Sequence, residues 1–175
     1  GLATAGRAVT AVRIEGPAPS VADRAEALAA ILRPFGEISV LREDSDILWR
    51  DIAAVRPLAA AAERQIWRLS VPPAHGAAAV ARILAHTAGD ALYDWGGGLV
   101  WLALDPAFDA HAATVRAAIA ASGGHATLMR APAAVRALVP VFQPQPPPLA
   151  ALARRVKDGF DPHRVLNPGR MTADA

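Results

Sequence analysis

The pattern of apolar and polar residues divides the chain into strand-like and helix-like segments. Alternation with a period of two predicts a strand, whereas apolar residues every three or four positions predict a helix. The expected strands are residues 8–15, 37–42, 65–71, 90–95, 99–104 and 125–130. The expected helices are residues 21–32 after Ser20 as N-cap, 45–55, 76–87, and a helix between Asp109 and Gly123.

The order of these elements indicates the fold class. It reads strand–helix–strand, an irregular link at 59–64, and then βαββαβ, which is the split βαβ, ferredoxin-like order. Gly96-Gly97-Gly98 lies between two expected strands and predicts a hairpin, because glycine readily takes the positive φ angles of a tight turn. The first half partly echoes the second in its strand, proline and helix layout. We therefore expect an α+β fold, with a mostly antiparallel sheet of about six strands and helices on one face.

Proline marks the end of this domain. Residues 143–148 contain four prolines, which predicts an extended linker. An apolar stripe at helical spacing predicts one further helix from Leu149 to Phe160, followed by a tail. The expected organisation is a domain at 1–142, the linker at 143–148, and a C-terminal helix and tail at 149–175.

One side of the predicted sheet carries candidate chemistry. In residues 65–71, Trp67 and Leu69 point to one side, and Arg68 and Ser70 point to the other. That second side is expected to carry Arg68, Ser70, Tyr93, Trp95, Trp101, His125 and Thr127. Aromatic rings beside a cation suit a flat ligand and an acid anion. The alternative is the solvated face of an antiparallel sheet, with Trp95 and Trp101 as a cross-hairpin pair and Arg68 solvated or in a salt bridge.

Composition supports a packed core and excludes several kinds of site. Hydrophobic residues make up 53% of the chain and charged residues 19%, which argues against disorder. The absence of cysteine excludes disulfides, thiolate catalysis, and Cys-ligated zinc or iron–sulfur clusters carried by this chain. The five histidines show no close metal-ligand spacing, so no metal site is expected.

Charge and hydropathy argue against two kinds of partner. The net charge of +2 is scattered rather than clustered, which argues against a nucleic-acid surface. The apolar stretches are shorter than the roughly 20 residues of a membrane span, and no signal peptide is visible. The start at Gly1, without methionine, indicates a piece of a longer protein.

The C-terminal sequence FDPHRVLNPGRM, residues 160–171, resembles the C-terminal signature of FAD-linked oxidases of the vanillyl-alcohol-oxidase type. That signature has a helix carrying Lys, then Phe-Asp-Pro, a short apolar stretch, and Asn-Pro-Gly followed by Lys or Arg. The matching residues are Lys157, Phe160, Asp161, Pro162, Asn167, Pro168, Gly169 and Arg170. Physically, Gly169 permits close backbone approach, Asn167 offers a donor and an acceptor, and Arg170 can hold a phosphate or carboxylate bidentately.

Three interior segments make this resemblance more specific. IWRLSVPP at 66–73, YDWGGGLVWL at 93–102 and GGHATLMRAP at 123–132 are similar to the FAD-binding second subunits of bacterial glycolate oxidases. With the tail, the resemblance covers nearly the whole chain. The metal-ligating His and Glu residues of the related D-2-hydroxyglutarate dehydrogenases have no clear counterparts here.

The resemblance implies part of an FAD-dependent oxidoreductase acting on a small 2-hydroxy acid such as glycolate or D-lactate. The acid would lose its hydroxyl proton to a base and its α-hydrogen as hydride to the flavin. Arg68 and Arg130 are the candidates to hold the substrate carboxylate. Arg68 is favoured because strict alternation turns Arg130 away from His125, which is the candidate base.

In these oxidases FAD is held mainly by an N-terminal domain with a glycine-rich loop. Neither Gly96–Gly98 nor Gly123-Gly124 leads from a strand into a helix, so no phosphate cradle is expected here. The resemblance implies that Asn167, Gly169 and Arg170 pack toward the flavin domain, and that the present chain by itself is inactive. The implied partners are other glycolate oxidase subunits, including a flavin subunit and an iron–sulfur subunit. The implied location is the cytoplasm, or the inner membrane surface through that complex.

Two other interpretations stay open. The same domain could be a non-catalytic assembly domain of the glycolate oxidase complex, with its sheet face and tail serving subunit contact. It could also be an unrelated ferredoxin-like module that binds a small molecule or regulates another protein. The tail separates the last interpretation from the others, because such a module has no need of the FDPHRVLNPGRM sequence.

Overall fold

The structure is a computed structural model that describes residues 8–171. The chain divides into two compact units, residues 1–54 and residues 55–175. The second unit contains the sheet and the candidate site.

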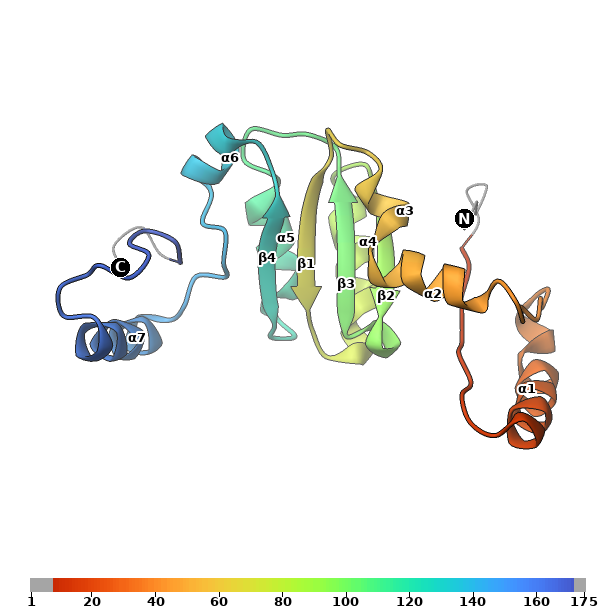
Figure 1. Cartoon of the computed structure of the whole chain (residues 1–175). Helices are drawn as coiled ribbons and strands as arrows, with labels where there is room; N and C mark the ends of the chain where they lie inside the picture. Colours follow the sequence, from red (N-terminus) through yellow and green to blue (C-terminus); the bar gives the residue numbers. More distant parts are fainter. Residues whose placement is uncertain (1–7, 172–175) are drawn as a thin grey trace. The chain divides into compact units, whose positions relative to one another are not determined.

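The sheet of the second unit has four strands in the order β2-β3-β1-β4, all paired antiparallel (Figure 1). The strands are β1 (Gln65–Ser70), β2 (Gly89–Asp94), β3 (Leu99–Leu104) and β4 (His125–Arg130). Helix α4 (Gly76–Leu84) joins β1 to β2, and α5 (Ala112–Ala120) joins β3 to β4. This is the expected α+β fold with the split βαβ, ferredoxin-like order.

The main core lies between the sheet and these two helices, which are behind the sheet in Figure 1. In a strand every second side chain points toward the helices, and these side chains are mainly apolar, with Gln65 and Tyr93 as polar exceptions. Each large aliphatic side chain buried there stabilises the fold by about 1.5–3 kcal/mol. The fully buried residues of this core include Trp67, Leu69, Ile83, Val100, Leu102, Leu104, Val115, Ile119 and Leu128.

A buried polar contact fixes the loop between β3 and α5. The Gln65 side chain donates to the carbonyl of Ala107 at 2.7 Å and accepts from its N–H at 3.2 Å. The indole N–H of Trp67 donates to the carbonyl of Ala110 at 2.9 Å. These bonds pair backbone groups of Ala107 and Ala110, which lie outside the sheet, with side chains of β1. The loop is therefore held against the end of the sheet.

The other face of the sheet is partly covered. Helix α3 (Arg56–Ala59) packs Leu58 against Ile66 and Ala103 in a second, smaller apolar cluster. The rest of this face, around Arg68, carries no helix of the second unit's core. Helices therefore build the main core on one side and leave part of the opposite side for polar chemistry.

The first unit has α1 (Ala18–Leu32), the short turn η1 (Arg33–Phe35) and α2 (Ser45–Ala53). Two expectations fail here. Residues 8–15 and 37–42 form no strand of the described sheet, which therefore has four strands rather than six. Alternation assigns faces to a strand but does not supply the neighbouring strand that its backbone needs. Helix α1 also begins earlier than expected, with Pro17 rather than Ser20 at the N-cap.

The C-terminal part has α6 (Ala133–Leu138), which the pattern did not predict, and α7 (Pro147–Phe160). The expected linker at 143–148 is therefore too long, because the last two of its prolines begin α7. Proline is well tolerated in the first turn of a helix, where no N–H bond is lost. None of the helices within residues 8–171 has the length and hydropathy needed to cross a membrane.

Candidate anion-binding face

Arg68 lies in the middle of the sheet, on the face away from α4 and α5. Its cross-strand neighbours are Trp101 in β3 and Thr127 in β4. The guanidinium carbon is 6.0 Å from the centre of the Trp101 ring and 5.9 Å from that of Trp95. Two aromatic faces near one cation attract it electrostatically and limit the positions of the side chain.

The Arg68 guanidinium has no acidic partner within residues 8–171; its described contacts are the two rings. The side chain is half-buried. Aromatic rings stabilise a cation but do not accept the in-plane N–H groups, so the guanidinium retains the fork that matches a carboxylate. The arrangement can therefore bind a small anion.

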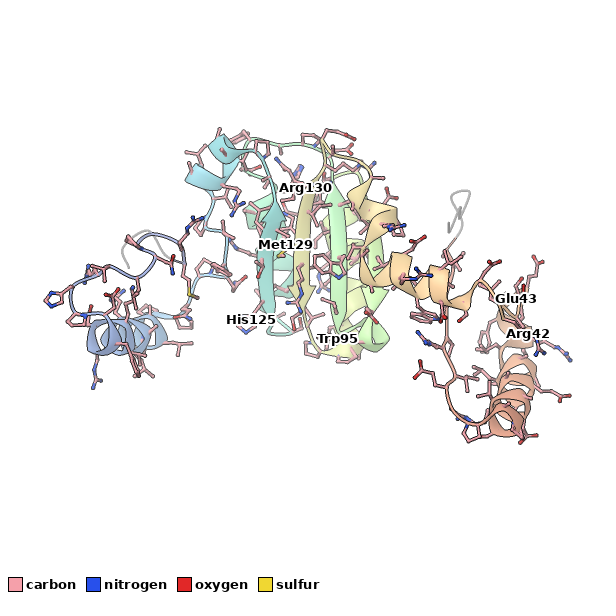
Figure 2. All side chains as sticks on the ribbon, viewed as in Figure 1. Arg42, Glu43, Trp95, His125, Met129 and Arg130 are labelled. Carbon is pink, nitrogen blue, oxygen red and sulfur yellow. The ribbon has the colours of Figure 1, made fainter. Side chains whose placement is uncertain are left out.

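Polar side chains surround this cation. Ser70 follows it by two residues on the same face and pairs with His125, while Thr127 is directly opposite Arg68. His125 is therefore a diagonal neighbour of Arg68, and the backbones of diagonal neighbours in such a ladder are about 7–8 Å apart. Figure 2 shows His125 and Trp95 at the same end of the sheet. The face thus combines a cation, two hydroxyls and an imidazole.

Trp95 owes its position to the hairpin between β2 and β3. Its backbone N–H donates to the Asp94 carboxylate at 2.7 Å, and its φ of 52° starts the turn. Gly96 and Gly97 continue the turn with φ angles of 63° and 97°. The glycines alone predict this turn, and Asp94 is a further signal for it that the prediction left out, because an aspartate before a turn often caps the backbone.

Tyr93 does not belong to this face. It pairs with Val100, whose side chain points into the core beneath the helices, so Tyr93 shares that side. Burial at this edge raises the pKa of the Tyr93 hydroxyl. The residues of β2 on the Arg68 side are Asp90, Leu92 and Asp94, which pair with Ala103, Trp101 and Leu99.

Arg130 is engaged elsewhere. A bulge in β4 brings Arg130 opposite Ile66 while Leu128 is opposite Trp67, which corrects the strict alternation expected from the sequence. The Arg130 guanidinium then donates to the carbonyls of Arg64 at 3.1 Å, Ala59 at 3.0 Å and Ala61. These bonds hold the segment after α3. Figure 2 shows Arg130 at the opposite end of β4 from His125.

The tail residues form a separate, local structure. Asp161 is almost fully buried and accepts from Lys157 Nζ at 2.6 Å and from the N–H groups of Val165 and Leu166, both at 2.9 Å. Asn167 has a φ of 47°, Gly169 has a φ of 70°, and the Arg170 N–H donates to the Asn167 carbonyl at 3.3 Å. Among the described residues, no hydrogen bond joins Asn167, Gly169 or Arg170 to the Arg68 face.

Gly76 and Gly124 allow close packing within the second unit and do not form a dinucleotide-binding loop. A Cβ on Gly76 would lie 2.1 Å from the Gly97 carbonyl, and a Cβ on Gly124 would lie 2.5 Å from the Ser70 carbonyl. Both glycines allow segments of the domain to touch, and no glycine-rich loop leads from a strand into a helix within residues 8–171. These residues do not fit the pyrophosphate of FAD. The same described residues contain no cluster of three potential metal ligands.

No protein-family model and no curated protein matches the sequence, and no solved structure matches the fold of the chain.

Proposed function

We propose that this chain is the substrate-side part of a flavin-dependent oxidoreductase for small 2-hydroxy acids. The observation that carries the proposal is the Arg68 guanidinium, which lies near two tryptophan rings without an acidic partner in the described chain. The resemblance of the tail and of three interior segments to FAD-linked oxidases supports the same conclusion.

In this proposal Arg68 binds the carboxylate of the acid through two parallel N–H bonds. Thr127 and Ser70 are positioned to donate to the same anion, and His125 is the group that can accept the proton of the 2-hydroxyl. Arg130 is a positioning residue for the segment after α3 rather than a ligand for the acid.

The described residues do not form a cradle for FAD, so we assign no step at the flavin to this chain. Flavin held by another domain or subunit would supply the redox chemistry. The residues proposed to face that domain are Asn167, Gly169 and Arg170. The stripe on α7 is exposed, with Phe160 85% accessible, which is compatible with such docking.

The first test measures anion binding by the 175-residue chain. Glycolate and D-lactate are titrated while tryptophan fluorescence is recorded, with ethylene glycol as the uncharged comparison. Because charge-assisted hydrogen bonds contribute about 1.5–3 kcal/mol, Arg68→Ala should weaken binding roughly 10- to 100-fold. Arg68→Lys should weaken it less, and Arg136→Ala, which removes an exposed arginine of α6, is the matched control. Equal affinity of Arg68→Ala and the unmodified chain contradicts the proposal.

The second candidate function is a non-catalytic assembly domain. The specific observation in its favour is the exposed apolar stripe of α7, formed by Leu149, Leu152, Val156 and Phe160. An assembly domain requires the stripe but not the Arg68 face. It is therefore the better interpretation if neither glycolate nor D-lactate changes the tryptophan fluorescence.

A further inference from the structure

The Arg68 face has an open apolar surface next to its cation. The centres of the Trp95 and Trp101 rings are 5.9 Å and 6.0 Å from the Arg68 guanidinium carbon. Trp101 is half-buried, whereas 63% of the Trp95 surface is exposed. An indole can bury a large apolar area and stack on another ring. The exposed Trp95 ring can therefore contact the apolar part of an anion that Arg68 binds.

The order of the strands separates this ring from the proposed base. Arg68 is in β1, which has β3 on one side and β4 on the other. His125 begins β4, and Trp95 is in the hairpin that joins β2 to β3, at the same end of the sheet (Figure 2). The bonds at carbon 2 of a hydroxy acid point in tetrahedral directions. With the carboxylate on Arg68 and the hydroxyl toward His125, the direction away from His125 takes the substrate side chain toward Trp95.

The charges on this side of the face argue against a second acid group on the ligand. The side chains that β2 and β3 present here include two carboxylates and no cation: Asp90, Leu92, Asp94, Leu99, Trp101 and Ala103. Asp94 directly precedes Trp95 and accepts from its backbone N–H at 2.7 Å. A carboxylate on the substrate side chain would approach Asp94, and charges of the same sign repel each other.

We propose that this site selects 2-hydroxy acids with an uncharged apolar side chain, preferably an aromatic one, and that Trp95 determines this specificity. The inference rests on the proposed function, because it places the substrate carboxylate on Arg68. Glycolate has no side chain at carbon 2, and D-lactate has a single methyl group. The benzyl group of D-3-phenyllactate can stack on the indole, where each fully buried methylene strengthens binding about fourfold and an aromatic pair adds roughly 2- to 10-fold.

Ligand affinities of the 175-residue chain test this specificity. The isotope-labelled chain is titrated in NMR with glycolate, D-3-phenyllactate or D-malate, and the amides of Arg68 and Thr127 report binding. Phenyllactate should bind about 10-fold more tightly than glycolate, because its ring covers part of Trp95. Malate, which has a second carboxylate, should bind less tightly than phenyllactate. Affinities for phenyllactate and glycolate within about twofold of each other, or malate as the tightest ligand, would overturn the proposal.

Variants of Trp95 test the residue itself. Trp95→Ala should reduce the preference for phenyllactate over glycolate to about twofold or less, whereas Trp95→Phe, which keeps a ring, should retain most of it. Phe108→Ala is the matched control and should leave the preference unchanged, because Phe108 is aromatic, 81% exposed and in the loop at the opposite end of β3 from the hairpin. Full preference in Trp95→Ala, or its loss in Trp95→Phe, contradicts the role of Trp95.

Arg68→Ala separates failure of this inference from failure of the proposed function. It should weaken the binding of glycolate and of phenyllactate alike, since both carboxylates use the same guanidinium. If Arg68→Ala weakens both ligands and the unmodified chain has no preference between them, the proposed function stands and the specificity is wrong. If neither ligand binds, or Arg68→Ala weakens neither, the proposed function fails and this inference fails with it.

Discussion

Three arginines of the second unit differ in role because their neighbours differ. Arg68 contacts two indole rings, and Arg130 donates to three carbonyls after α3. Arg116 stacks on Trp67 at 5.6 Å and donates to the carbonyls of Pro140 and Phe142, and burial lowers its pKa. Carbonyl acceptors occupy the donors of a guanidinium, whereas rings leave them open. Arg68 is therefore the one of these three suited to an anion.

Asp161 gives the tail a dependence on pH. The hydrogen bond from Lys157, assisted by the N–H groups of Leu166 and Val165, lowers the pKa of Asp161 to about 2. An unfolded aspartate titrates near about 3.9, so the folded turn favours the ionised form. Its contribution is complete above pH 4 or so and is lost as the pH falls through about 2. We expect the amide protons of Val165 and Leu166 to lose protection in that window when followed by NMR.

Asp161→Asn should remove this transition and leave both amides weakly protected at every pH. Asp158→Asn is the matched control, because the Asp158 carboxylate is exposed and pairs with Arg164 at 3.4 Å. A transition of equal size in Asp161→Asn would show that another group controls the turn.

At the scale of elements, Gly76 joins the start of α4 to the hairpin between β2 and β3. Replacing it with alanine places a Cβ 2.1 Å from the Gly97 carbonyl, a backbone atom that cannot rotate away. Although alanine favours helix, this overlap should destabilise the second unit by about 1–3 kcal/mol. Urea unfolding followed by tryptophan fluorescence measures the loss. Gly159→Ala in α7 is the control, since nothing lies within 4 Å of its added Cβ and no loss is expected there.

The four strands of the second unit were predictable because local signals bound them. Alternation identifies β1, and the glycines after Trp95 separate β2 from β3. The bulge that redirects Arg130 was not predictable, because the carbonyls that Arg130 contacts belong to a segment more than 60 residues earlier in the chain. The same alternation suggested strands at 8–15 and 37–42, whose pairing depends on a neighbour that local pattern does not encode.

The candidate site was predictable to a similar extent. Alternation correctly grouped Arg68, Ser70, Trp101, His125 and Thr127 on one face, since a period of two fixes the side of every residue in a regular strand. It misplaced Tyr93, because the assignment of β2 needed the register with β3. That Arg68 would lie near two rings depends on the conformation of Trp95 in the hairpin, which the glycines allow but do not specify.

At the scale of the whole molecule, the proposed function requires two binding surfaces, one for an acid anion and one for a flavin. The second unit offers a face for an acid anion but no loop for a pyrophosphate, because its close-packed glycines hold the domain together. Strong dinucleotide binding requires N–H groups at the start of a helix and glycines that admit the phosphates. We therefore expect the 175-residue chain to bind glycolate without holding FAD.

Gel filtration after mixing with FAD measures this expectation. The eluted chain should show no flavin absorption, and the fluorescence of added FAD should match that in the presence of the urea-unfolded chain. Glycolate should still change the tryptophan fluorescence of the same sample, because Arg68 lies outside any flavin site proposed here. A chain that elutes yellow would mean that residues other than a glycine-rich loop hold the dinucleotide. If the chain binds neither ligand, the assembly function is the better interpretation, because it requires only the exposed apolar stripe of α7.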